Sequence, residues 1–309
     1  MKKDRVVLAP AFTMIELIFV IVVMGIVAMI ASDIIANMYN RYLLSRTYNR
    51  LEIKTEQALD VISRRLEYRI KPSVIAKEFN NSMIPLSAVA GHAYPILEWL
   101  GYDNDGLDGN YDSTAGMVVP GWDGFVDLNA SSTSQITTPG SYLQSVAKPI
   151  LDALSQDINT SAEKPAIVFF NANMNNPYRY GWNGGDFNNT IPVTLTGETT
   201  MNLNNTPDSI HEKYYLAWSA YAIVPLQTDG SNCTNPSTQD CNLYFYYDFR
   251  PWEGDEYQNG TRALITEHIT QFTFKQIGGA IHVKLCAADV SFNKYAEQNA
   301  SICKERVIF

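Results

Sequence analysis

The hydrophobic pattern of this chain is strongest near its N-terminus. Residues 17–31 contain no polar side chain, and as an α-helix they would measure about 22 Å at 1.5 Å per residue. A bilayer core is about 30 Å thick, so this run spans it only if the helix begins at Phe12. That extension places the carboxylate of Glu16 in the hydrocarbon, where a charge costs about 2.5–3.5 kcal/mol even on the mildest scale. Glu16 is therefore a candidate functional residue.

An amphipathic pattern follows without a break. Apolar and aromatic residues recur at steps of three and four among charged ones; examples are Met38, Tyr42, Leu44, Tyr48, Leu51, Ala58, Leu59, Ile62 and Leu66. No Pro or Gly occurs between Ile26 and Lys71, and Pro72 ends the pattern. One helix is predicted over residues 12–70, about 90 Å long, which spans a membrane and then supports a globular body. A coiled coil is the alternative, but no sustained heptad is evident.

The remaining chain predicts a loop-rich region followed by strands. Residues 71–165 are rich in Gly, Asp, Asn and Ser, with a helix expected near residues 142–158. Strands are expected at residues 166–171, 191–196, 213–224 and 242–249. The clearest hairpin joins residues 269–275 to residues 280–285 around Gly278 and Gly279. The fold class expected is α+β, a long N-terminal helix followed by an antiparallel β-sheet.

Composition and charge narrow the class of protein. Of the 309 residues, 46% are hydrophobic and 18% are charged, as in a folded body. The formal net charge is −9. Removal of residues 1–11 takes away Lys2, Lys3, Arg5 and Asp4, a net +2, which leaves −11. Nucleic-acid binding needs concentrated Lys and Arg, so a broad nucleic-acid face is not expected.

All four cysteines lie in the last quarter of the chain, at Cys233, Cys241, Cys286 and Cys303. An even count without a C-x-x-C pair favours two disulfides over a metal site. Three pairings are possible, and local loop closure favours Cys233–Cys241 and Cys286–Cys303; four buried free thiols are the alternative. Disulfides persist in oxidising compartments, so the N-terminus is expected inside the cytoplasm and the body outside.

The N-terminal segment has two ordinary interpretations, a secretory signal peptide and an uncleaved membrane anchor. Lys2, Lys3 and Arg5 resemble the basic region of a signal peptide. The apolar run, however, starts late, has Glu16 at its entrance, and lacks a good small-x-small cleavage site. An anchor would hold Glu16 at the level of the lipid headgroups.

A third interpretation comes from the order of residues 11–17, Ala-Phe-Thr-Met-Ile-Glu-Leu. This stretch resembles the prepilin cleavage motif of type IV pilins and type II secretion pseudopilins. The resemblance implies cleavage between Ala11 and Phe12 by prepilin peptidase and N-methylation of Phe12. It also implies that Glu16 pairs with the new N-terminal amine of a neighbouring subunit. Such a pair would relieve the cost of burying each charge alone.

The chain departs from the family pattern in three ways. Ala11 stands where the family prefers Gly, and Met14 replaces Leu, which conserves volume. No proline interrupts the apolar helix, which is more typical of minor subunits than of major pilins. The resemblance covers roughly residues 1–40.

The expected organisation follows from both lines of argument. It comprises a leader at residues 1–11, a transmembrane helix and filament core at residues 12–36, and an amphipathic stalk at residues 37–70. An irregular insertion at residues 71–165 and a β-sheet region with two disulfides at residues 166–309 complete it. The expected protein is a single-pass inner-membrane protein with its body in the periplasm or in an extracellular filament. Its expected partners are prepilin peptidase, other pilin or pseudopilin subunits and the assembly platform, with nucleic acid relevant only in DNA uptake.

An acidic segment in the loop-rich region is a candidate calcium site. Asp103, Asp105, Asp108 and Asp112 lie within ten residues that also contain Gly106 and Gly109. Calcium prefers several oxygen ligands at tight turns. The spacing does not match an EF-hand loop, and a solvated turn cluster is the alternative.

Catalytic signatures are scarce. His92, His211, His268 and His282 lie far apart, without H-E-x-x-H spacing, and no G-x-S-x-G or phosphate-binding glycine loop is present. A non-enzymatic filament subunit is expected. The alternative is a membrane-anchored extracytoplasmic binding protein or hydrolase that does not polymerise. The motif is shared by type II secretion, type IV pilus and DNA-uptake machines and does not choose among them.

Overall fold

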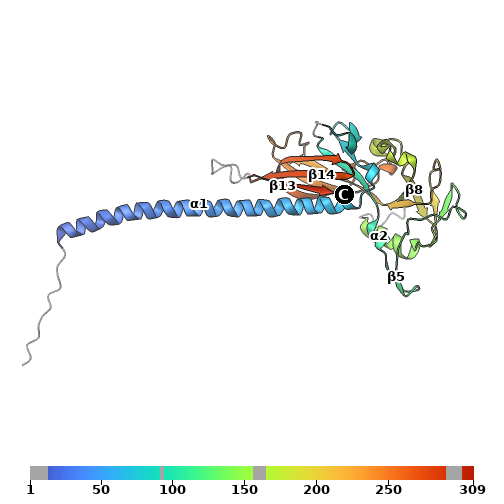
Figure 1. Cartoon of the computed structure of the whole chain (residues 1–309), viewed down its shortest axis with the longest axis horizontal. Helices are drawn as coiled ribbons and strands as arrows, with labels where there is room; N and C mark the ends of the chain where they lie inside the picture. Colours follow the sequence, from blue (N-terminus) through green and yellow to red (C-terminus); the bar gives the residue numbers. More distant parts are fainter. Residues whose placement is uncertain (1–12, 91–93, 156–164, 290–300) are drawn as a thin grey trace, which may run out of the picture. The chain divides into compact units, whose positions relative to one another are not determined.

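The computed structural model describes residues 13–90, 94–155, 165–289 and 301–309 (Figure 1). The chain divides into two compact units at residues 1–50 and 51–309. In the first unit the described residues form the N-terminal part of helix α1 (Met14–Glu67). The second unit contains the last turns of α1 and all the strands.

Helix α1 begins and ends where its sequence provides the signals. Thr13 precedes its first residue, and the Thr13 hydroxyl accepts a hydrogen bond from the backbone N–H of Glu16 at 3.3 Å, as an N-cap side chain does. Arg64 and Arg65 lie in the last turn, where cations favour the helix dipole. The predicted range of 12–70 is three residues too long at its C-terminal end, because Ile70 N–H donates to Leu100 O at 2.8 Å and joins the sheet.

Within the described residues the main sheet has eight antiparallel strands in the order β15-β14-β13-β12-β11-β3-β1-β2. Their bounds are β1 (Ile75–Lys77), β2 (Met83–Pro85), β3 (Ile96–Gly101), β11 (Ser219–Gln227), β12 (Cys241–Phe249), β13 (Thr261–Ile277), β14 (Ala280–Ala288) and β15 (Ser301–Ile308). Figure 1 shows β13 and β14 beside each other in this sheet.

The chain leaves the main sheet at the end of β3 and returns to it at the start of β11, where Gly101 pairs with Ser219. Residues 102–218 form the segment that we call the inserted lobe. In the part of the lobe that the structure describes, five strands pair in the order β10-β7-β8-β9-β6, and β4 pairs with β5. The bounds are α2 (Asn104–Asp108), β4 (Asn110–Asp112), β5 (Met117–Val119), β6 (Gln135–Thr137), a π-helical turn η3 (Leu143–Ala147), α3 (Lys148–Leu154), β7 (Ala166–Phe169), β8 (Ile191–Leu195), β9 (Thr200–Leu203) and β10 (Tyr214–Ala217).

Both faces of the main sheet are covered at the central strands β3 and β11, which explains the long apolar runs of these strands. On one face Leu59, Ile62 and Leu66 of α1 pack into a core with residues of β3, β11 and β13. On the other face Val168 and Trp182 of the inserted lobe share a core with Ala220, Ala222 and Val224 of β11. Every residue of β3 is therefore buried. A strand buried on both faces is expected to lack the alternation of a half-exposed strand.

Two expectations about this region are corrected. Residues 71–165 were expected to be irregular, but they supply β1, β2 and β3 to the main sheet and β4, β5 and β6 to the lobe. The strand expected at residues 213–224 is divided between β10 and β11, which belong to different sheets. The helix expected over residues 142–158 is present as η3 and α3 within residues 143–154; residues 156–158 lie outside the described residues.

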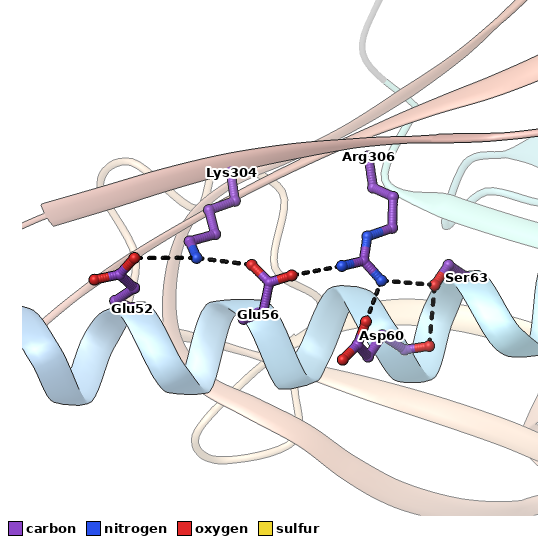
Figure 2. Close-up of polar contacts among 6 residues, drawn as sticks. All are labelled: Glu52, Glu56, Asp60, Ser63, Lys304 and Arg306. Atoms are coloured by element: carbon purple, nitrogen blue, oxygen red, sulfur yellow. Dashed lines mark hydrogen bonds and ion pairs between the residues drawn. The ribbon is translucent and has the colours of Figure 1, made fainter.

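A charged contact joins α1 to the edge strand β15 (Figure 2). Lys304 Nζ lies 2.7 Å from Glu56 Oε2 and 3.4 Å from Glu52 Oε1. Arg306 binds Glu56 at 2.5 Å and also binds Asp60. The hydrogen bond from Lys304 lowers the pKa of the Glu56 carboxyl below its ordinary value. The contact therefore stabilises the fold above that ordinary value, and its contribution is lost as pH falls through the lowered one.

Replacing Arg306 by Ala is expected to lower Tm by only a few degrees, because these side chains remain partly exposed and water screens the pairs. The loss should shrink in high salt, since salt screens exposed charges. Thermal unfolding of the wild type and R306A at low and high ionic strength measures both effects. A loss of Tm that is independent of salt would mean that Arg306 acts through packing of its apolar stem.

A second ion pair is fully buried in the main sheet. Lys77 of β1 and Glu98 of β3 are each 1% exposed, and Lys77 Nζ lies 3.5 Å from Glu98 Oε1. The same ammonium lies 5.5 Å from the centroid of the Tyr257 ring. Burial raises the pKa of Glu98 to about 7, and the neighbouring Lys77 opposes that rise. The pair lies among apolar residues of the second core.

Candidate functional site

The apolar part of α1 is the first candidate site, because its side chains have no protein partner in the first unit. The apolar residues between positions 14 and 35 are exposed; Phe19, Met24 and Ile35 are 71%, 71% and 66% exposed. An 18-residue window of this helix has a mean hydropathy of 2.8, and none of the window is buried. The helix is long and apolar enough to cross a membrane. Such a surface is stable only when lipid or other apolar helices cover it.

Glu16 lies in the first turn of this helix, where a carboxylate favours the positive end of the helix dipole. The spacing Thr13-x-x-Glu16 is that of a capping box. Half of the box is present, since the Glu16 N–H donates to the Thr13 hydroxyl. Thr13 is thus a residue that the sequence analysis did not single out, although the spacing was visible. A capping role competes with the assembly role expected for Glu16.

Ala11 and Phe12, the expected positions of cleavage and N-methylation, lie outside the described residues. Both expectations remain predictions.

The structure contains the two disulfides that local loop closure favours. Cys233–Cys241 links the loop after β11 to the first residue of β12, with Cα atoms 5.9 Å apart. Cys286–Cys303 joins directly opposite residues of β14 and β15, with Cα atoms 4.0 Å apart. This second bond fixes the edge strand that carries Lys304 and Arg306. It therefore supports the contact between the sheet and α1.

Three of the four aspartates of the expected calcium site have separate local roles, and the fourth, Asp105, lies in the first turn of α2. Asp103 is buried and its Oδ1 accepts the Gly106 N–H at 3.0 Å as the N-cap of α2. Asp108 Oδ2 accepts from Asn104, and Asp112 Oδ1 accepts two backbone N–H groups of a turn. Among the described residues, no group of three or more His, Cys, Asp or Glu side chains is placed to hold a metal ion. The hydrogen bonds of Asp103, Asp108 and Asp112 are those of local turns, and the calcium site stays a prediction.

Burial nevertheless gives Asp103 an unusual carboxyl group. Desolvation raises its pKa to about 6, and the hydrogen bond from Gly106 opposes this rise. Its Oδ2 atom is buried without a hydrogen-bond partner.

The histidines that the structure describes remain apart. His211 contacts Ser209, His268 contacts Asp240 and His282 contacts Glu305. These are three separate surface pairs on the inserted lobe and the main sheet. His92 lies outside the described residues.

In comparisons with known proteins, no protein-family model, no curated protein and no solved structure matches the chain.

Proposed function

We propose that this chain is a subunit of a type IV pilus or type II secretion pseudopilus, a minor pilin or pseudopilin without enzymatic activity. The observation that carries the proposal is the exposed apolar part of α1 with Glu16 at its start. The prepilin-like motif at residues 11–17 adds specificity. The subunit is cut after Ala11, N-methylated on Phe12 and packed through its apolar helix against the helices of neighbouring subunits.

The charge of Glu16 fixes the axial position of one apolar helix relative to the helix of a neighbouring subunit. A carboxylate inside an apolar helix bundle is costly alone, and the freed amine of Phe12 on a neighbouring subunit compensates it. Only one axial offset of two helices brings these groups together. The pair therefore selects the correct neighbour among many apolar arrangements.

The position of the inserted lobe supports a terminal rather than a repeating place in the filament. The lobe begins against the C-terminal end of α1, where Tyr102 N–H donates to Tyr68 O at 3.0 Å. The two tyrosine rings are in edge-to-face contact at 5.8 Å. The lobe of residues 102–218 makes the body larger than an ordinary major pilin, which favours a place that few subunits occupy. The subunit is therefore suited to the tip.

Mass analysis of the chain purified from membranes of cells that contain prepilin peptidase tests processing. The expected mass lacks residues 1–11 and includes one added methyl group. A matched sample from cells without the peptidase should retain the leader. If the chain starts at Met1 in both samples, the anchored, non-polymerising alternative replaces this proposal.

A further inference from the structure

The part of α1 that follows its apolar span carries cations and no acid. Between Asp33 and Glu52 the charged side chains are Arg41, Arg46 and Arg50. All three arginines are exposed. Among the residues that the structure describes, none of the three has an ion-pair partner. Three uncompensated positive charges therefore lie on one helical segment, directly after the residues that are apolar enough to cross a membrane.

The same segment carries three exposed tyrosines. Tyr39, Tyr42 and Tyr48 are 60%, 61% and 40% exposed. One face of the helix holds four of the tyrosines and arginines at steps of three, four and four residues: Tyr39, Tyr42, Arg46 and Arg50. Tyr is enriched where a membrane meets water, because its ring is apolar and its hydroxyl group is polar. A stripe of Tyr and Arg therefore suits the headgroup layer of a membrane.

Distance along the helix decides which arginines reach the headgroups. Counted from Ile35, near the end of the expected span, Arg41 and Arg46 lie about 9 and 16 Å along the axis. The polar layer on each side of a bilayer core is about 5–8 Å thick. Each Cα–Cβ bond tilts towards the N-terminus of the helix, which is the membrane side, and long Arg side chains extend this reach. Arg41 therefore reaches the headgroups, and Arg46 lies within about one Debye length of them, about 8 Å.

Membrane topology does not account for these arginines. With the N-terminus in the cytoplasm, as the two disulfides of the body favour, the arginines lie on the outer side of the membrane. The positive-inside rule places the cations that flank a span in the cytoplasm instead. A contact on the outer side of the membrane gives the three charges a role that orientation does not.

The chemistry of the side chains identifies the ligand. A guanidinium group binds phosphate oxygens through two parallel N–H donors. A zwitterionic headgroup pairs its phosphate with its own ammonium group, whereas an anionic headgroup leaves the phosphate charge uncompensated. Because the segment directly follows the apolar span, the phosphates nearest to its arginines are those of lipids.

We propose that residues 39–50 of α1 bind the headgroups of anionic phospholipids at the outer face of the membrane, with Arg41 and Arg46 on the phosphates and Tyr39 and Tyr42 at the level of the headgroups. The contact holds the helix at one depth while the subunit is in the membrane. This inference rests on the membrane insertion of α1 that the proposed function includes, and it does not depend on filament assembly.

The test uses the full chain with Tyr42→Trp in mixed vesicles of phosphatidylcholine and phosphatidylglycerol. The new indole lies at the interface, whereas the five native tryptophans lie in the second unit and are at most 8% exposed. Brominated acyl chains quench a neighbouring indole, so either lipid is brominated in turn. We expect quenching by both lipids and about a fivefold preference for phosphatidylglycerol, the equivalent of about 1 kcal/mol. The preference should fall in high salt.

Arginine variants in the Y42W chain separate headgroup binding from general attraction. The triple variant R41Q/R46Q/R50Q should lose the preference and keep its quenching by phosphatidylcholine. Arg64→Gln makes the same change at an exposed position 23 residues beyond Arg41 on the same helix, and should keep the preference. Gln and Arg have similar helix propensities, so all variants are expected to fold. The proposal is overturned if the two lipids quench equally or if the triple variant keeps the preference. Absence of quenching by either lipid would overturn it too, and would separately contradict insertion of α1.

Discussion

Replacing Glu16 by Gln is expected to reduce incorporation of the chain into filaments by more than a hundredfold while leaving the processed subunit in the membrane. The amide keeps the shape of the side chain, but in the proposed filament it would not compensate the amine of Phe12 on a neighbouring subunit. Removal of one partner of a buried ion pair costs about 3–5 kcal/mol, and each 1.4 kcal/mol is a factor of ten. The measurement is the amount of chain in sheared filaments, or cross-linked to neighbouring subunits, relative to the amount in the membrane.

Two variants of the same helix serve as controls. Asp33→Asn removes the next acid of α1 and should leave incorporation close to that of the wild type. Thr13→Ala removes the hydroxyl that accepts from the Glu16 N–H. This variant measures how much the N-cap alone contributes to incorporation. If E16Q behaves like T13A, Glu16 acts as a helix cap, and the assembly role is wrong.

Replacing Lys77 by Met is expected to destabilise the body by about 3–5 kcal/mol, the cost of leaving one partner of a buried ion pair alone. Glu98 would then be buried at 1% exposure without its cation. Denaturant unfolding of the second unit, followed by near-ultraviolet circular dichroism of its tryptophans, measures the change. A cost below about 1 kcal/mol would mean that Glu98 takes up a proton, or that water or a rearranged neighbour solvates it.

The double variant Lys77→Met with Glu98→Leu is the control for this result. Replacing a whole buried ion pair by apolar side chains is often neutral or stabilising, so the double variant is expected to recover most of the stability lost in K77M. Failure to recover would assign the effect of K77M to the shape of the side chain at position 77.

The raised pKa of Glu98 also predicts that the free energy of unfolding depends on pH. Its pKa is about 7 in the folded state and 4.5 ordinarily, so between these values the folded state holds more protons than the unfolded state. The stability contributed by Glu98 is therefore complete below pH 4.5, falls as pH rises towards 7, and changes little above it. Glu98→Gln should remove this slope. An identical slope in wild type and E98Q would contradict the raised pKa.

Sequence patterns predicted the local elements of the fold well. The single long helix and the strands β7, β8 and β12 lie close to their expected ranges. The hairpin of β13 and β14 has its expected turn, but β13 begins eight residues before and β14 ends three residues after the expected ranges. Each has a signal confined to neighbouring residues, such as the period of the helix or the Gly278-Gly279 turn. The two disulfides also close local loops.

The elements that were missed depend on distant partners. β3 contains Glu98 within a short apolar run, and only its pairing with β1 brings Lys77 to that carboxylate. The boundary between β10 and β11 falls at Trp218, where the chain passes from one sheet to another within a continuous apolar stretch. The pocket lined by Phe187 and Trp252 unites four segments separated by up to 70 positions, from Gly184 to Gly254. No periodic pattern among neighbouring residues predicts such long-range contacts.

The departure and return of the chain through Gly101 and Ser219 have a consequence for the order of folding. The strands that pair there, β3 and β11, are central in the main sheet, yet the whole inserted lobe separates them in sequence. Closing so long a loop in a disordered chain carries an entropic cost. The lobe has its own core and internally paired strands, so its early collapse would hold the two ends together beforehand. We expect newly made chains to form the lobe first and to complete the sheet around it.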